Sequence, residues 1–293
     1  MNRLLLLLTL LLLCQPASAL PEAEIQRYLD EAIKAGGGEV VIPPGVHLIE
    51  RGLRLKDTKK LRIIGLDAEE TVLKAAGKTN SLFLLSGACE EVRIEKLTFE
   101  GGQDAVSEMA EPGLMNKFSK VHVGRCFFQN QRRAAVLLPK AAIEALEIEN
   151  CTFRDIDGAG VVFGEGMTGC SITHNHLTRC KVGITLAGSQ RCLVASNEIS
   201  ACGTGLLITA AAEVQTIEQG NVVALNAITG SLGNAIQLNS RSLKNSVIQN
   251  EISGSAGDGI HLLGDAHGVK GNKITGSGGQ NIAIQEGKHE IVE

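Results

Sequence analysis

The stretches NAITGSLGNAIQLN (226–239), NEISGSAGDGIHLL (250–263) and NKITGSGGQNIAIQ (272–285) follow one another along the chain and share one pattern. Each begins with Asn and an aliphatic residue two places later, passes through a segment rich in Gly and Ser, and ends in alternating aliphatic residues. Alternation of this kind is typical of a strand with one buried face, and Gly with Ser is typical of a turn. Each stretch therefore predicts two short strands joined by a turn.

The same unit recurs from residue 97 onward, with successive spacings of 29, 25, 24, 22, 29, 24 and 22 residues. The residues three places before and two places after its first position are apolar in every unit. A leucine-rich repeat of similar period usually needs a helical or 3₁₀ segment in each unit, whereas both halves of this unit read as strands. The repeat therefore predicts an all-β fold, a right-handed parallel β-helix solenoid. The first positions of the units are Leu97, Cys126, Cys151, Asn175, Asn197, Asn226, Asn250 and Asn272.

The recurring asparagines are expected to be structural. Asn tolerates the left-handed backbone region better than most residues, which suits a one-residue bend between two strands. Neighbouring coils of a parallel β-helix lie about 4.8 Å apart, so stacked Asn side chains can hydrogen-bond along the axis. We therefore expect an asparagine ladder at this corner and no catalytic role for it.

Residues 1–19 have the organisation of a signal peptide. Arg3 supplies a positive charge, residues 4–13 an apolar run, and residues 17–19 a cleavage site of small residues. The apolar run is too short to span a membrane, which takes about 20 residues, and no later stretch is apolar enough to do so. We expect cleavage after Ala19 and a secreted protein, periplasmic or extracellular.

Residues 20–293 are expected to form a single domain with an N-terminal cap at residues 20–38. Ile25, Tyr28 and Leu29 fall at helical spacing within 21–35, and three glycines follow at 36–38. The first coil of a solenoid has no preceding neighbour to bury its apolar end. An amphipathic helix before the first coil is therefore predicted to cover it.

Composition excludes some partners. The chain has 28 Lys and Arg against 32 Asp and Glu, and losing Arg3 with the signal peptide leaves 27 − 32 = −5. A mildly acidic chain without a basic run argues against a nucleic-acid partner. The absence of Trp and the single Tyr also argue against a dedicated carbohydrate-binding module, because such modules commonly stack sugars on aromatic rings.

Six cysteines fall in pairs at equivalent places in adjacent coils. Side chains that stack in parallel strain the dihedral angle of a disulfide. We therefore expect Cys126 and Cys151 to be inward thiols, and the turn pair Cys180 and Cys202 to form the disulfide that an oxidising compartment would favour.

Nearly the whole of the expected mature chain resembles the pectin-lyase-like superfamily, and the repeats from Leu97 to Ile284 are similar to the generic parallel β-helix repeats of that group. GGGEVVIPPGVHLI (36–49) after a short helix is similar to the entry segment of that group, and LRIIGLDAEETVLKAA (61–76) is similar to its first full coil. The resemblance implies the β-helix fold and a polysaccharide partner lying across the outer face of the Gly-Ile-x-Leu strands. It does not select a reaction, since the superfamily contains lyases, hydrolases, epimerases, phage depolymerases and binding proteins.

The densest set of polar residues on those strands lies in two adjacent coils. Alternation turns Gln237 and His261 outward, and His is the side chain best suited to proton transfer near neutral pH. Arg241 could pair with a uronate carboxylate. No cluster of Asp suggests Ca²⁺, no metal site is expected, and the residues indicate no particular cofactor. The candidate catalytic residues are Asp258, His261 and Asp265, and the candidate substrate-binding residues are Gln237, Asn239, Arg241 and His267.

Two functions remain open from the sequence. One is an enzyme of the lyase, hydrolase or epimerase type acting on a polysaccharide. The other is a non-catalytic β-helix that serves in binding or in the cell envelope, which the largely neutral outward positions of the strands favour.

Overall fold

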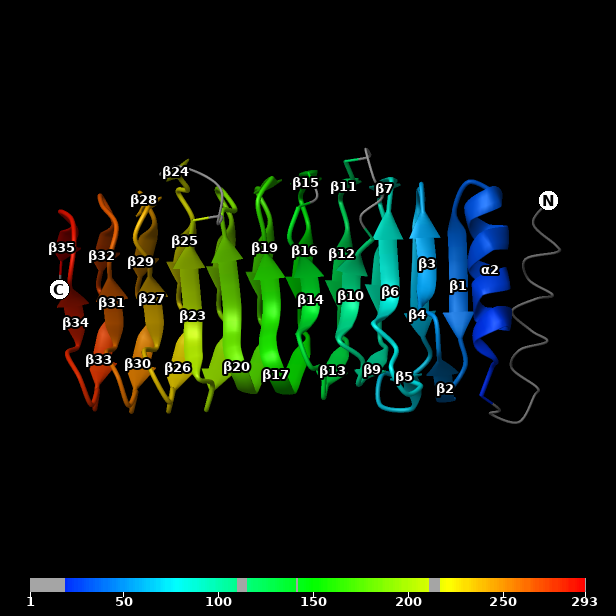
Figure 1. Ribbon diagram of the computed structural model, residues 1–293, viewed down its shortest axis with the longest axis horizontal. Coiled ribbons are helices and arrows are strands. Elements are labelled where there is room, and N and C mark those ends of the chain that lie inside the picture. Colours follow the sequence, from blue (N-terminus) through cyan, green and yellow to red (C-terminus); the bar gives the residue numbers. More distant parts are fainter. Residues whose placement is uncertain (1–18, 110–114, 141, 211–216, 293) are drawn as a thin grey trace.

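The computed structural model describes residues 19–109, 115–140, 142–210 and 217–292, so the expected signal peptide lies outside the described residues except for Ala19. The described chain is a right-handed parallel β-helix whose coils are stacked along one axis, with a helix at the N-terminal end (Figure 1). Every strand pairing in it is parallel, as expected when each coil adds one strand to each sheet.

Sheet A runs along one side of the coils and contains the strand before the corner of each unit. Its central residues face the core, and Ile94, Val123 and Val247 lie in register along the axis at no more than 1% exposure. Its strands are β1 (Gly38–Ile42), β4 (Leu61–Gly65), β8 (Arg93–Glu95), β12 (His122–Gly124), β16 (Glu147–Glu149), β19 (Ser171–Thr173), β21 (Leu193–Ala195), β25 (Val222–Ala224), β29 (Ser246–Ile248), β32 (Gly268–Lys270) and β35 (Glu290–Val292).

Sheet B contains the two strands after the corner, which form two ribbons side by side. In ribbon B1 they are β2 (Gly45–Ile49), β5 (Thr71–Ala75), β9 (Thr98–Glu100), β13 (Phe127–Gln129), β22 (Glu198–Ser200), β26 (Ala227–Thr229), β30 (Glu251–Ser253) and β33 (Lys273–Thr275). In ribbon B2 they are β3 (Leu53–Lys56), β6 (Ser81–Ser86), β10 (Asp104–Glu108), β14 (Ala134–Leu138), β23 (Thr204–Thr209), β27 (Ile236–Leu238), β31 (Ile260–Leu262) and β34 (Ile282–Ile284). Two long strands, β17 (Thr152–Phe163) and β20 (His176–Ala187), begin in ribbon B1 and end in ribbon B2.

Two short sheets lie between ribbon B2 and sheet A. Sheet C consists of β7 (Ala88–Glu90), β11 (Lys117–Ser119), β15 (Ala142–Glu144) and β18 (Met167–Thr168). Sheet D consists of β24 (Ile217–Glu218) and β28 (Ser242–Leu243).

The helix α2 (Glu22–Lys34) covers the first coil, as the sequence predicts. Ile25 and Leu29 are fully buried in the same core cluster as the strands, and Tyr28, Ala32 and Ile33 pack against it. Burial of this stripe closes the apolar end of the solenoid. Among helices in the described ranges, none has the length and apolar character to cross a membrane.

The asparagine ladder is confirmed at the corner between sheet A and ribbon B1. Each Asn accepts the backbone N–H of the corner residue one coil before it and donates to a backbone carbonyl of that coil, as in Asn226 accepting from Asn197 N at 3.0 Å and donating to Val194 O at 2.9 Å. The ladder links Asn175, Asn197, Asn226, Asn250 and Asn272.

The expectation that these asparagines themselves adopt the left-handed backbone conformation is wrong. The left-handed residue is the one before, with φ of 57° at Leu225 and 52° at Gln249. That residue turns the chain and is solvent-exposed, which leaves the Asn side chain directed inward to satisfy buried backbone groups. The asparagine is selected here for hydrogen bonding and not for its backbone freedom.

The cysteines agree with one of the two expectations. Cys126 and Cys151 are inward thiols, each 1% exposed. Cys180 and Cys202 are also buried free thiols, so the expected disulfide between them is not formed in this structure. Their place in the coil, five residues after the corner, faces the core and does not form an exposed turn.

Candidate functional site

The outer face of ribbon B2 carries one outward residue per coil in strict register. Gln237 is paired with His261 on the next coil, and His261 with Ala283. The neighbours before them are Leu207, Thr185 and Val162. Polar side chains with acid–base capacity are therefore confined to the C-terminal coils of this column, as alternation in the sequence predicts.

His261 and Asp258 form a hydrogen-bonded pair on this face. Nδ1 of His261 lies 2.7 Å from Oδ2 of Asp258, and the two side chains are 20% and 19% exposed. Because a carboxylate only accepts, Nδ1 donates and the proton-transfer position is Nε2. Burial alone raises the pKa of Asp258, but the hydrogen bonds from His261 and from the backbone N–H of Gln280 outweigh it and lower that pKa. Asp258 is thus held as a carboxylate that orients the imidazole.

Gln285, one coil further, contacts the free side of the ring. Its side-chain amide lies 3.1 Å from Nε2 of His261. With the amide oxygen toward the ring, Nε2 donates and the ring is an imidazolium; with the amide nitrogen toward it, Nε2 accepts and the ring is neutral. The same neighbour therefore accommodates both the acid and the base form of His261.

Amide side chains continue the polar surface on the preceding coil. Nε2 of Gln237 donates to Oδ1 of Asn239 at 2.7 Å. Asn234 donates to Oε1 of Gln237 at 3.3 Å and accepts the backbone N–H of Asp258 at 2.8 Å. Asn234 therefore positions Asp258, a role that sequence reasoning missed. The signal was present, since Asn234 in GSLGN occupies the place of Asp258 in GSAGD.

Asp265 and Arg241 are not drawn into this group. Oδ1 of Asp265 accepts the backbone N–H of Lys288 at 2.6 Å, and this bond is the main cause of the lowered pKa of Asp265. Arg241 is exposed in the turn after β27, with a left-handed φ of 68°. Alternation fixes directions only within a strand, and both residues lie beyond the strand ends.

His267 is a core residue, which corrects its expected place on the substrate face. It is 0% exposed and stacks on His289 with ring centroids 5.2 Å apart. Its Nδ1 accepts the N–H of Asn245 at 3.2 Å and its Nε2 lies 3.1 Å from Leu263 O, which fixes a neutral ring. Burial lowers its pKa to about 4. It therefore cannot contact a ligand from this position.

The hydrogen bonds of His267 continue a second ladder, five residues before the first. Asn221 accepts the N–H of Cys192, Asn245 that of Asn221, His267 that of Asn245, and His289 that of His267. The position is occupied by Cys170 and Cys192 in earlier coils. The repeat therefore carried the signal that His267 is inward.

Another ion pair lies on the N-terminal coils of ribbon B2. Asp104 is 0% exposed, and both of its carboxylate oxygens accept from Arg133. The hydroxyl of Ser81 lies 3.4 Å from Oδ2 of Asp104 and 2.8 Å from the hydroxyl of Ser107. These contacts occupy both oxygens of the Asp104 carboxylate, so this pair is structural. In the Asp258–His261 pair, by contrast, Nε2 of the ring contacts only the exposed side chain of Gln285.

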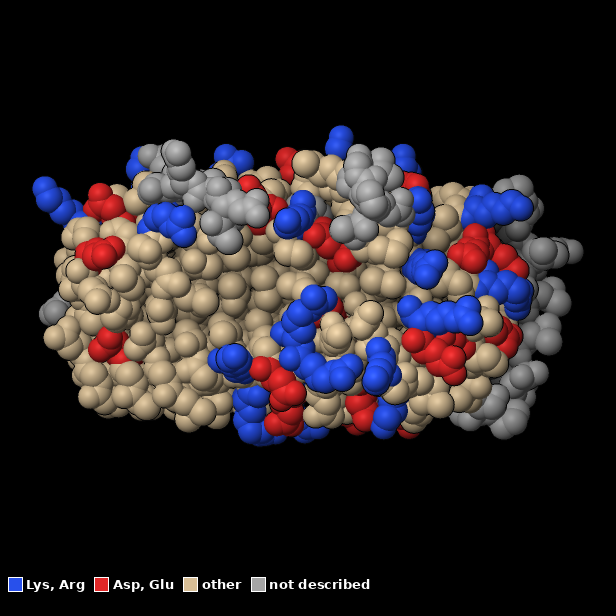
Figure 2. Space-filling view, viewed as in Figure 1, with Lys and Arg blue, Asp and Glu red and all other residues tan. Residues whose placement is uncertain are grey.

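Charge on this side of the molecule is uneven along the axis. Figure 2 shows Lys, Arg, Asp and Glu gathered over the middle and N-terminal coils and sparse over the C-terminal coils. Among the described residues, no group of three or more His, Cys, Asp or Glu is arranged to hold a metal ion.

Coils that stack in register and pair only in parallel define the class of right-handed parallel β-helix proteins. The sequence matches the family model described as right handed beta helix region over residues 114–270, which is more than half of the chain. The chain belongs to this family. A search of the curated proteins finds no match.

Solved structures share the fold at low sequence identity. The A-module of the mannuronan C-5 epimerase AlgE6 of Azotobacter vinelandii is similar over 93% of both chains, with a TM-score of 0.71 and 16% identity. The A-module of AlgE4 from the same organism covers 92% of this chain and 91% of its own, with a TM-score of 0.64 and 15% identity. A mutant tailspike protein of E. coli bacteriophage HK620, in complex with a hexasaccharide, has a TM-score of 0.64 and 11% identity; 92% of this chain is covered, but only 61% of that one. The structural similarity establishes the shared fold, but at sequence identities this low it does not indicate which reaction, if any, the chain performs.

Proposed function

We propose that this protein is a secreted β-helix enzyme, periplasmic or extracellular, that acts on a polysaccharide lying across the outer face of ribbon B2, with His261 as the proton-transfer residue. The observation that carries the proposal is the Asp258–His261 hydrogen bond of 2.7 Å on that face, which leaves Nε2 of the ring as the reactive position. The fold it shares with epimerase modules and with a hexasaccharide-bound tailspike supports the substrate class.

The pair fits removal of a proton from carbon better than hydrolysis. Glycoside hydrolysis commonly needs two carboxyl groups on either side of the bond. Here Asp258 is bonded to His261 and Asp265 is turned to Lys288. A neutral His261 can take the proton beside a sugar carboxylate, while Asp258 stabilises the imidazolium that forms. Return of a proton from water to the opposite face of that carbon gives epimerisation; departure of the neighbouring glycosidic oxygen, protonated by the imidazolium, gives a lyase reaction.

A second function, binding without turnover, is favoured by the column itself. Leu137, Val162 and Leu207 occupy the outward positions before Gln237 and supply no acid or base. A glycan held on this partly apolar strip would be recognised without reacting.

The test is a panel of uronic-acid and neutral polysaccharides, with three readouts in parallel. Ultraviolet absorbance reports unsaturated uronates, reducing-end assays report hydrolysis, and proton NMR in deuterated water reports exchange at the epimerised carbon. We expect His261→Ala to lose at least about a hundredfold in rate, the usual contribution of a general base, and Asp258→Asn to lose less.

His176→Ala is the matched control, because His176 is an exposed histidine paired with Glu198 at 2.9 Å on ribbon B1. It should keep the wild-type rate. Full activity in the double variant Asp258→Asn/His261→Ala would place the reaction elsewhere. Binding to the panel without any turnover would favour the non-catalytic function.

A further inference from the structure

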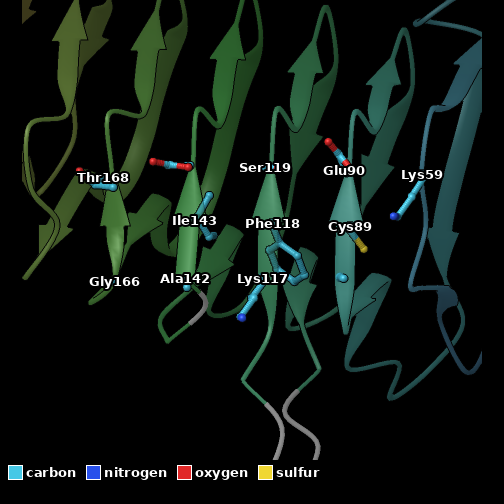
Figure 3. A pocket seen from close by; sticks show the side chains of 12 residues that line it. Lys59, Cys89, Glu90, Lys117, Phe118, Ser119, Ala142, Ile143, Gly166 and Thr168 are labelled. Carbon is cyan, nitrogen blue, oxygen red and sulfur yellow. The ribbon is translucent and has the colours of Figure 1, made fainter.

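A second surface, separate from ribbon B2, lies on the outer face of sheet C. A groove of about 400 Å³ runs over β7, β11, β15 and β18, crossing consecutive coils (Figure 3). Its underside is rigidly packed, since the inward residues Cys89, Phe118 and Ile143 are no more than 2% exposed. The outward side chains are therefore held at fixed places along the axis.

One side of the groove is a continuous row of polar side chains. Parallel pairing aligns one from each of five successive coils, so neighbours are about 4.8 Å apart. Figure 3 shows Glu90, Ser119 and Thr168 of this row at the ends of neighbouring strands. The hydroxyl of Thr168 accepts from Arg191 at 2.9 Å, which leaves its proton to donate. The polar row is Lys59, Glu90, Ser119, Glu144 and Thr168.

The other side of the groove is shallow because three of its four residues are alanine or glycine. Ala88, Lys117 and Ala142 are in register at the beginnings of the strands, followed by Gly166 (Figure 3). Only Lys117 extends from this row. Small residues beside a polar row leave room for a chain lying along the axis.

The charges in the groove balance. Lys59 and Lys117 carry positive charge, while Glu90 and Glu144 carry negative charge two coils apart. A polyanion following the polar row would meet both carboxylates at close range, which is unfavourable. Uncharged hydroxyl groups, in contrast, donate strong hydrogen bonds to carboxylates and accept from ammonium groups.

We propose that this groove binds an extended, uncharged polysaccharide that runs parallel to the β-helix axis, with one sugar residue per coil. The spacing of the polar row is comparable to the length of one sugar in an extended chain, so each coil can contact successive hydroxyls. The site goes beyond the proposed function, because it lies on a different sheet from His261 and needs no proton transfer.

The test is calorimetric binding of the full chain without its signal peptide to β-1,4-glucan hexaose, β-1,4-mannan hexaose and a mannuronate hexamer. We expect at least one neutral hexaose to bind and the mannuronate hexamer to bind at least tenfold more weakly at this site. Ala142→Arg fills the shallow row and should abolish binding. Glu144→Ala removes one hydrogen-bonding carboxylate and should weaken binding about tenfold.

Glu251→Ala is the matched control, because Glu251 is an exposed strand glutamate on ribbon B1. It should bind as the wild type does. Circular dichroism checks that each variant is folded. The proposal would be overturned if Ala142→Arg kept the wild-type affinity or if neither neutral hexaose bound. It would also be overturned if the mannuronate hexamer bound as tightly as the neutral hexaoses and Ala142→Arg abolished that binding. Loss of binding in Ala142→Arg with unchanged turnover would separate this groove from the site on ribbon B2.

Discussion

The corner after sheet A is built differently in the two halves of the molecule. In the earlier coils Leu97, Cys126 and Cys151 are buried there without an amide ladder, and the residues two places on form a stack of phenylalanine rings. Phe128 stacks on Phe99 at 4.9 Å and on Phe153 at 4.8 Å, with interplanar angles of 6° and 7°.

From Asn175 onward the same corner is a chain of amide hydrogen bonds over aliphatic residues. The two halves join where the backbone N–H of Cys151 donates to Oδ1 of Asn175 at 2.9 Å. Both halves have the same backbone path at this corner, so the repeat determines the backbone geometry but not which side chains stabilise it. One half is stabilised mainly by apolar burial and ring packing, the other by satisfaction of buried polar groups.

Substitution in the phenylalanine stack should lower the free energy of unfolding more than substitution in the asparagine ladder. Phe128→Ala removes a ring that is 1% exposed and contacts both neighbours, and we expect it to lower the free energy of unfolding by about 4 kcal/mol. Urea unfolding followed by circular dichroism measures it. A loss below about 1 kcal/mol would mean that the stack is not a principal source of stability.

Asn226→Ala breaks the middle of the ladder. It removes the acceptor of the Asn197 N–H and the donors to Val194 O and Asn250. Several buried groups lose their partners, and we expect a cost of about 3 kcal/mol. Cys126→Ala at the equivalent corner of the other half loses only a small apolar group and should cost about 1 kcal/mol. Equal costs in urea unfolding would contradict the contrast between the halves.

The second ladder should make the C-terminal half sensitive to acid. The pKa of His267 is about 4 in the folded protein, below its ordinary value of 6.5. The stability that a neutral buried ring contributes is therefore present above pH 6.5 and is lost as the pH falls toward 4. We expect a loss of about 2 kcal/mol between pH 7 and pH 5.

His267→Asn should remove this pH dependence while keeping the ladder, since Asn221 and Asn245 occupy the same place. His176→Asn, at an exposed histidine, should leave it unchanged. Thermal unfolding at a series of pH values decides between them, and a pH slope that persists in His267→Asn would exclude His267 as its source.

Asp258→Asn should have the smallest effect on stability. Its partner His261 is partly exposed, and exposed pairs contribute about 0 to 1 kcal/mol. We expect the melting temperature to change by less than about 3 °C in a chain of this size. A larger loss would show that the pair on ribbon B2 is structural, like Asp104 with Arg133.

Prediction from sequence succeeded for most strand residues, because the period of two inside a strand decides direction; Ile284 in β34, expected to face the core, is 53% exposed. Phe128, Ile252 and Ile260 face the core, while Gln237 and His261 face outward, as alternation requires. The capping helix followed from its apolar stripe in the same way. The Asn side chains of the ladder were also foreseen, because equivalent residues stack in a parallel repeat.

Apart from Cys180, which was taken for a turn residue but lies inside β20, the errors fall beyond strand ends, where side-chain direction depends on the path of the turn. Asp265 and His267 both follow β31, yet one is exposed and the other is inside the second ladder. The left-handed residue was misplaced by one because Asn was taken as the bend when Leu225 and Gln249 make it. Comparing His267 with Asn245 and Cys192 across the repeat would have placed it correctly.

Because the coils stack at a constant spacing, two residues at equivalent positions are separated along the axis by a whole multiple of about 4.8 Å. Gln237 and His261 lie one coil apart, while Lys59 and Thr168 lie four coils apart along the groove over sheet C. Removing or duplicating a whole coil between two surface sites would change their separation along the axis by one coil, about 4.8 Å, and leave each site intact. The reach between a binding groove and a reactive histidine can thus change only in whole steps, as the length of a bound polymer does.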